Sequence, residues 1–204
     1  MCDCSQPSSA EYFNSIASKW DSWEDLEFLK AQFDNGLKRF GLHPDEHVLD
    51  VGCGTGNLAA AILRQLSKAG RITAVDISSG MIEIAQTKVN DARVQWICDS
   101  VEHMITYENV FDRVICYSVW PHLMNPEMVA RVFHRVLKFD GKLHIWHLKS
   151  REVINKTHAR ASEVISNHLL APASQTAVLL EQSGFIIEET LDDDSGYLVS
   201  ARKV

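Results

Sequence analysis

The sequence predicts an α/β fold, namely a doubly wound, seven-stranded, mostly parallel sheet with an N-terminal helical lid. Two observations carry this prediction. Short apolar segments alternate with amphipathic ones through most of the chain, which is typical of buried parallel strands joined by helical crossovers. The last two apolar segments are separated only by Asp192–Gly196. That connection is too short for a crossover, so we expect the last strand to be antiparallel.

Length and composition favour one globular domain over residues 1–204, with the lid in 1–40 and the core in 41–204. A chain of this length buries roughly 70% of the surface that it exposes when unfolded. The net charge of −7, with scattered Lys and Arg, argues against nucleic acid as a partner. The sequence has no apolar run of about 18 residues and no signal-peptide pattern, so we expect no membrane contact and a cytoplasmic location. Five cysteines are an odd number, which favours reduced thiols.

The elements follow from apolar spacing. Before the first strand, apolar positions between Tyr12 and Phe40 predict two amphipathic helices. Helical spacing recurs over Leu58–Leu66. Asn125 and Pro126 predict an N-cap and a first turn for another helix. The expected strands are Val48–Val51, Ile72–Val75, Val94–Cys98, Arg113–Tyr117, Lys142–Leu148, Phe185–Leu191 and Tyr197–Ala201.

A turn with three alternating glycines, Gly52, Gly54 and Gly56, follows the first strand. Glycines let backbone amides approach a ligand closely at the end of a strand. Their spacing differs from the Gly-x-Gly-x-x-Gly of nicotinamide-dependent oxidoreductases, which makes that class of enzyme a poor match. The turn predicts a cofactor site of another kind.

Three acids stand at the ends of three successive strands. Asp50 ends the first strand, Asp76 the second and Asp99 the third. In such sheets ligands bind beyond the carboxyl ends of the strands. Three carboxylates would repel a pyrophosphate but suit a cationic ligand, and Asp76 is placed to take the hydroxyls of a ribose. Taken alone, Asp76 would equally fit a helix cap.

This pattern resembles the class I S-adenosylmethionine-dependent methyltransferases over nearly the whole chain. Their glycine motif is similar to Val48–Gly56, their ribose acid to Asp76 and their adenine-edge acid to Asp99. Phe111–Tyr117 resembles their fourth strand. Val136–Leu143 resembles the turn before their fifth strand, although it lacks their Pro-Gly-Gly and so leaves the shape of the turn open. The resemblance implies a Rossmann-like core.

The resemblance also implies which residues hold S-adenosylmethionine. The methionine moiety is expected at Asp50 and the loop residues Gly52, Cys53, Gly54 and Gly56, and the ribose at Asp76. The faces of the adenine are expected to contact Ile77 and Met81, and its edge to contact Asp99, Ser100 and Val101. Tyr117, at the end of the fourth strand, is also expected to contact the cofactor. Cys53, Cys98 and Cys116 all fall at strand ends. We expect them to be small, buried packing residues, with thiol chemistry as the alternative.

The aromatic N-terminal segment is the expected lid over the cofactor, with Tyr12 and Trp20 as the residues that contact it. An aromatic face could stabilise a sulfonium by cation–π attraction. Phe13 and Trp23 are expected to serve ordinary helix packing. The thiolates of Cys2 and Cys4 could bind a soft metal ion, but two ligands at a chain terminus are a weak indication of a metal site.

The acceptor is expected to be a small molecule. In-line displacement from a sulfonium needs alignment, water exclusion and removal of any proton on the nucleophile. Enzymes of this fold that methylate amides or bases often carry Asn or Asp followed by Pro-Pro-Tyr after the fourth strand. Here that position reads Tyr117-Ser118-Val119-Trp120-Pro121-His122.

Histidines concentrate in the C-terminal half of the chain. There the chain resembles a subgroup of these enzymes, and this resemblance does not indicate a particular reaction. His122 and His147 follow strands, Arg151, Asn155 and His158 share a helix face, and His168 lies in an expected irregular segment. Three interpretations stay open: structural imidazoles, a general base at His122 or His147, or a transition-metal site. Arg151 is expected to serve the acceptor together with His122 and His147. The candidate metal ligands are His122, His147, His158 and His168.

Methyl transfer to a small acceptor is therefore the function that the sequence favours. One alternative is a methyltransferase whose acceptor is bound by a histidine-held divalent transition metal. The other is a module that binds S-adenosylmethionine without catalysis.

Overall fold

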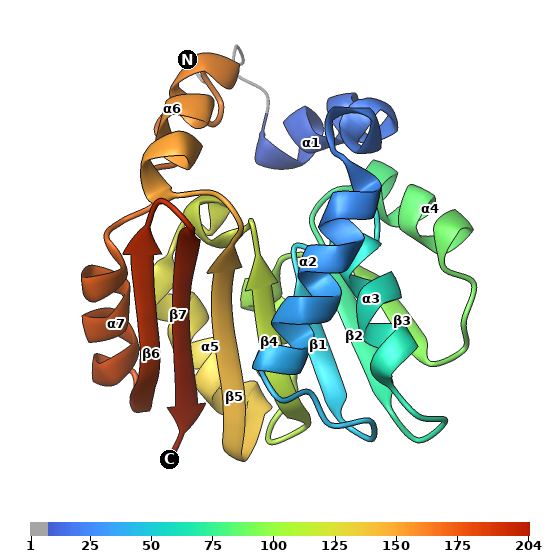
Figure 1. Ribbon diagram of the computed structural model, residues 1–204, viewed down its shortest axis with the longest axis vertical. Coiled ribbons are helices and arrows are strands. Elements are labelled where there is room, and N and C mark those ends of the chain that lie inside the picture. The colour runs from blue at the N-terminus through green and yellow to red at the C-terminus, as the bar shows by residue number, and fades with distance from the viewer. Residues whose placement is uncertain (1–7) are drawn as a thin grey trace.

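A computed structural model describes residues 8–204 of the chain and shows a seven-stranded sheet in the order β3-β2-β1-β4-β5-β7-β6 (Figure 1). All neighbouring strands are parallel except at β7, which is antiparallel to both β5 and β6. The predicted fold class is confirmed. The strands are β1 (His47–Val51), β2 (Arg71–Asp76), β3 (Val94–Cys98), β4 (Phe111–Tyr117), β5 (Leu137–His147), β6 (Phe185–Asp193) and β7 (Gly196–Lys203).

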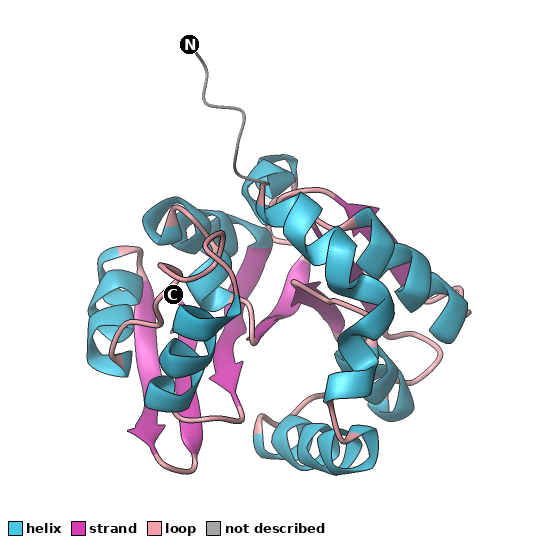
Figure 2. Cartoon of the chain, turned by 90° about the horizontal axis from the view of Figure 1, so that it is seen from above, coloured by secondary structure: helices cyan, strands magenta, loops and turns pink. Residues whose placement is uncertain are grey.

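Helices cover both faces of the sheet (Figure 2). They are α1 (Ser9–Trp20), α2 (Leu26–Arg39), α3 (Asn57–Gln65), α4 (Ser79–Lys88), α5 (Pro126–Val136), α6 (Arg151–Ala161) and α7 (Ala173–Gln182), with short 3₁₀ turns η1 (Asp21–Trp23), η2 (Val101–Thr106) and η3 (Trp120–His122). One apolar core lies between the sheet and α5 and α7, and a second lies between the sheet and α2 and α3. None of the helices in residues 8–204 is long and apolar enough to cross a membrane.

Side-chain caps explain where several helices begin. Ser8 and Glu11 form a reciprocal capping box at the start of α1. Asn125 accepts a hydrogen bond from the amide of Met128, and Pro126 fills the first turn of α5, as the sequence predicts. Ser150 caps α6 in the same way.

The turn before the fifth parallel strand is built without Pro-Gly-Gly. β5 pairs with β4 at Leu137, and the register then shifts before Lys142. Asp140 takes a positive φ of 61° within this excursion, a conformation that non-glycine residues rarely adopt. A Cβ on Gly141 would lie 2.8 Å from the Lys138 carbonyl oxygen, so the single glycine is required there.

A buried polar network holds the amino edge of the sheet. Arg113 on β4 is 3% exposed and pairs with Glu46, with Nε–Oε2 at 2.7 Å. Its NH1 group donates to Nε2 of His144, whose Nδ1–H must then donate to Ser200. The network ties β1, β4, β5 and β7 together at the edge opposite to the glycine turn.

Two helices stand beyond the carboxyl edge of the parallel strands. α1 lies over the β1 side of the sheet and α6 over the β5–β7 side (Figure 1). Both predicted N-terminal helices are present, although α1 begins earlier than Tyr12. Cys2 and Cys4 lie outside the described residues. This arrangement places the lid and the histidine-bearing helix on either side of the expected cofactor site.

Candidate active site

Two cavities lie at the carboxyl edge and share part of their lining. About 940 Å³ of space lies within the larger and about 580 Å³ within the smaller, and both figures include space that is open to solvent. Trp20, Gly52, Gly54 and Ser118 line both. The two cavities therefore adjoin each other at the glycine turn, and together they are called the cleft below.

The glycine turn is shaped by positive φ angles that favour glycine, at 64° for Gly52, 51° for Gly54 and 82° for Gly56. A Cβ on Gly52 would lie 2.3 Å from Val119, so Gly52 is needed for packing. A Cβ on Gly54 would meet nothing within 4 Å, which leaves room for a ligand against the backbone. Gly56 lines neither cavity but begins α3.

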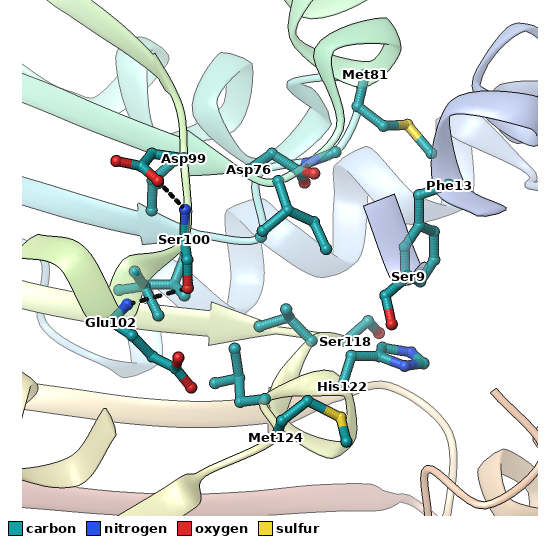
Figure 3. A pocket seen from close by; sticks show the side chains of 18 of the residues that line it. Ser9, Phe13, Asp76, Met81, Asp99, Ser100, Glu102, Ser118, His122 and Met124 are labelled. Carbon is teal, nitrogen blue, oxygen red and sulfur yellow. Dashed lines mark hydrogen bonds between the residues drawn. The ribbon is translucent and has the colours of Figure 1, made fainter. Parts of the chain in front are cut away.

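The larger cavity contains the residues predicted for ribose and adenine. Asp76 and Asp99 line it together with Ile77, Met81, Ser100 and Val101. Figure 3 shows Asp99 and Ser100 at one end of this cavity and Phe13, Ser9 and His122 at the other. Asp76 also accepts hydrogen bonds from the amides of Gly54 and Ser78, each at 2.9 Å. Asp76 therefore holds the glycine turn in place as well as facing the cavity.

The smaller cavity contains Asp50 and Cys53, which are predicted for the methionine moiety, and also Tyr117 from the end of β4. Asp50 is 1% exposed, and its Oδ2 has no hydrogen-bond partner within the described part of the chain. Burial, with Asp76 nearby, raises the pKa of Asp50 to about 7. Glu24 lines the same cavity. An orphaned carboxylate of this kind fits a cationic group such as an α-ammonium.

The thiols differ from one another. Burial raises the pKa of both Cys53 and Cys116, which keeps them protonated and favours packing over chemistry. Cys98 is exposed, so the expectation that it is buried is wrong. The reason is that β3 is an edge strand of the sheet.

The lid contacts the cleft through Phe13 and Trp20 and not through Tyr12, which lines neither cavity. Ser9 and Phe13 are four residues apart on α1 and so share a helix face, whereas Tyr12 is turned by one position. Trp23 is 59% exposed. Two networks hold the lid: Asn14 accepts from Ser78 and Gly80, and Asp21 accepts from groups on α3 and α4.

Of the three predicted catalytic residues, only His122 lines the cleft. His147 is 2% exposed at the end of β5, and its ring packs edge-on against Tyr197. Arg151 pairs with Asp192 at 3.0 Å. The structure therefore places His147 and Arg151 behind the cavity wall and leaves their predicted catalytic role without a contact to the cleft.

The four predicted metal-ligating histidines do lie together. Nδ1 of His122 and Nδ1 of His168 are 2.9 Å apart, and the His122 and His158 rings are 4.7 Å apart at their centroids. His147 lies close enough to lower the pKa of His122. Within residues 8–204, however, no group of three or more His, Cys, Asp or Glu side chains is arranged to hold a metal ion.

Some lining residues carried no signal in the sequence. Ser118 lines both cavities and takes a positive φ of 55°, a strained conformation typical of functional sites. Val119, Leu123 and Met124 complete an apolar wall beside His122. They follow the fourth strand without a motif, so only the fold reveals them.

Comparison with known proteins agrees with this geometry. A family defined as a methyltransferase domain matches residues 48–141. Malonyl-[acyl-carrier protein] O-methyltransferase of Priestia megaterium is 33% identical over 132 residues, which are 64% of this chain and 47% of that protein. Over residues 48–141 the chain therefore matches a methyltransferase domain, and it is similar to methyltransferases beyond that range.

Other relatives of the chain are named for a different reaction. The ubiquinone/menaquinone biosynthesis C-methyltransferase UbiE of Vibrio cholerae is 26% identical over 175 residues, which are 81% of this chain and 66% of that protein. A methyltransferase structure from Aquifex aeolicus superposes with a TM-score of 0.75 at 22% identity, covering 92% of this chain and 98% of that one, which shows the shared fold. The chain spans about half to two thirds of the length of these two curated relatives.

Proposed function

We propose that this chain binds S-adenosylmethionine in the shared cleft and transfers its methyl group to a small-molecule acceptor. The observation that carries the proposal is that the two cavities adjoin at Gly54, which lines both. One cavity presents Asp76 and Asp99, the other presents the orphaned Asp50, and the wall beside His122 is mainly apolar. A ligand that carries an adenosyl group and positive charge would find a suitable chemical environment in each of these parts of the cleft.

Each part of the cleft then has a chemical task. S-adenosylmethionine would supply a methyl group on a sulfonium: the acceptor's nucleophilic atom bonds to the methyl carbon in line with the carbon–sulfur bond, which breaks and releases S-adenosylhomocysteine. Asp50 offers charge to the ammonium end, and the Gly54 backbone admits the ligand without a clash. Phe13 and Trp20 line the lid side of the cleft, where their rings limit the access of water. His122 lies close to Met124 at the apolar end, where an acceptor would enter.

The relatives do not identify the atom that accepts the methyl group, because one is named an O-methyltransferase and another a C-methyltransferase. We propose a small molecule over a nucleic acid because the part of the larger cavity beside His122 is apolar, with Val119, Leu123 and Met124 in its lining. A strongly basic surface, which nucleic-acid binding would need, is not expected at a net charge of −7.

Calorimetric titration tests the binding step, and release of S-adenosylhomocysteine tests the chemistry. We expect S-adenosylmethionine to bind with one site per chain and NAD not to bind. Incubation with phenols, carboxylic acids and thiols should then release S-adenosylhomocysteine with one of these classes. Binding without release in every class would favour the non-catalytic module, and a lack of binding would contradict the proposal.

A further inference from the structure

Four histidines from four different elements meet behind the acceptor end of the cleft. His122 comes from η3, His147 from the end of β5, His158 from α6 and His168 from the loop between α6 and α7. His122 alone opens into the cleft, where Figure 3 shows its ring facing the cavity. The ring of Phe13 packs edge-on against it at 5.2 Å.

The contact between His122 and His168 defines a direction for proton transfer. Their Nδ1 atoms are 2.9 Å apart, so one of the two carries a hydrogen that points at the lone pair of the other. When His122 Nδ1 is the donor, His122 Nε2 is a free lone pair available to the cleft. His168 lies in an outer loop and keeps 9% of its surface exposed.

Two further side chains hold His168 in this place. Nδ1 of His158 lies 2.6 Å from the His168 carbonyl oxygen, and because a carbonyl only accepts, His158 must donate there. Asn155, one turn earlier on α6, binds the loop twice: its amide donates to the Leu170 carbonyl at 3.1 Å and accepts from the Leu170 amide at 2.8 Å. The loop is therefore fixed to α6 on both sides of Leu169.

We propose that His122 and His168 form a proton relay from the acceptor to solvent, with His158 and Asn155 as positioning residues. The inference rests on the proposed function and adds that the acceptor carries a proton on its nucleophilic atom. In the step, the acceptor atom bonds the methyl carbon as the carbon–sulfur bond breaks. The acceptor's proton moves to Nε2 of His122, the Nδ1 proton of His122 moves to Nδ1 of His168, and His168 releases its Nε2 proton to water.

The relay avoids the build-up of positive charge on His122, which would occur if His122 acted as a base without His168. Burial, with His158, His168 and His147 around it, lowers the pKa of His122 to about 3, so an imidazolium there is costly. Passing a proton out as another arrives keeps His122 neutral. The charge then develops on His168, whose pKa is also lowered but which reaches solvent.

Histidine NMR on the full chain tests the relay without knowledge of the acceptor. In protein labelled with ¹⁵N-histidine and treated with chelator, we expect one strongly deshielded proton shared between Nδ1 of His122 and Nδ1 of His168. That signal should vanish in H168F and persist in H43Q, a matched change of an exposed histidine. On acidification the first proton taken up by the pair should appear on His168. Protonation of His122 first, or no shared proton, would overturn the proposal.

Kinetics with an acceptor found by the screen above provide a second readout. A general base contributes about 10²–10⁴-fold, so we expect H122F to lower kcat by about 100-fold or more. H168F should lower kcat by about tenfold and N155A by less, with the Kd for S-adenosylmethionine unchanged in all three. Wild-type kcat in H168F would show His122 to act alone and would overturn the relay.

The two experiments separate the relay from the function on which it rests. If S-adenosylmethionine does not bind the wild-type chain, the proposed function fails, whatever the NMR shows. If it binds and the shared proton is absent, only the relay fails. Stoichiometric metal on the histidines of protein purified without a tag would replace the relay by a metal centre.

Discussion

A single residue of the cleft can affect both the stability of the fold and the binding of a ligand, and Asp50 is the clearest case. Its folded pKa of about 7 lies above its ordinary value, so the folded chain holds a proton between about pH 4 and 7 that the unfolded chain has lost. The free energy of unfolding therefore falls as pH rises through this window. The ionised form, which a bound cation needs, is destabilising in the free protein.

We expect Asp50→Asn to raise the thermal stability of the free chain at pH 8 and to change it little at pH 4. The same change should weaken S-adenosylmethionine binding. In the wild type, binding near pH 7 should release a proton, because the ammonium favours the ionised carboxylate. Calorimetry in buffers of different ionisation enthalpy measures that release, and identical heats in both buffers would contradict it.

Gly52 and Gly54 form a matched pair of substitution sites. Both take positive φ, which costs an alanine about 1–2 kcal/mol. Gly52→Ala should also displace Val119 and so lower the melting temperature further. Gly54→Ala projects into the ligand space and should instead raise the Kd for S-adenosylmethionine by about tenfold, which is 1.4 kcal/mol. Equal effects of the two changes on melting and binding would refute this division.

At the scale of elements, side chains attach α1 to the start of α4, as the proposed lid over the cofactor requires. Oδ1 of Asn14 accepts from Ser78 Oγ at 2.7 Å and from the Gly80 amide at 2.9 Å. We expect Asn14→Ala to weaken S-adenosylmethionine binding about three- to tenfold, since each hydrogen bond contributes about 0.5–1.5 kcal/mol. Amides of α1 should exchange faster as well. Ser15→Ala, whose hydroxyl contacts only its own helix, is the control.

The elements show which features the sequence could predict. The seven strands, the hairpin at the end of the chain and the acids at three strand ends follow from local periodicity and spacing, and the structure contains them. Contacts to the cleft were less predictable. Tyr12 and Phe13 are adjacent aromatics, and only the rotation of α1 against α4 selects Phe13. Arg151 was expected at the site, but Asp192, 41 residues away, holds it.

For the whole molecule, buried neutral histidines predict sensitivity to acid. Burial lowers the pKa of His122 and His147 to about 3 and that of His144 well below its usual range. Below about pH 6.5 the unfolded chain binds protons there that the folded chain does not. The free energy of unfolding should therefore fall as pH drops, by up to about 1.4 kcal/mol per pH unit for each such histidine.

Urea unfolding at pH 7.5, 6.0 and 5.0 measures this slope. His147→Gln should reduce it by about one proton, whereas H43Q should leave it unchanged. A slope that H147Q does not alter would show that His147 is not held neutral in the fold.

The reversed direction of β7 has a practical consequence for handling the protein. Because this strand runs against its neighbours, Val204 leaves the sheet at the amino edge, while the cleft opens at the carboxyl edge (Figure 1). A fluorophore or surface tether attached at Val204 would therefore stand a full strand length away from the cleft. Ser9 lines the cavity itself, so the same attachment at Ser9 would lie against the cleft. Single-molecule or immobilised assays should anchor the chain by its last residue.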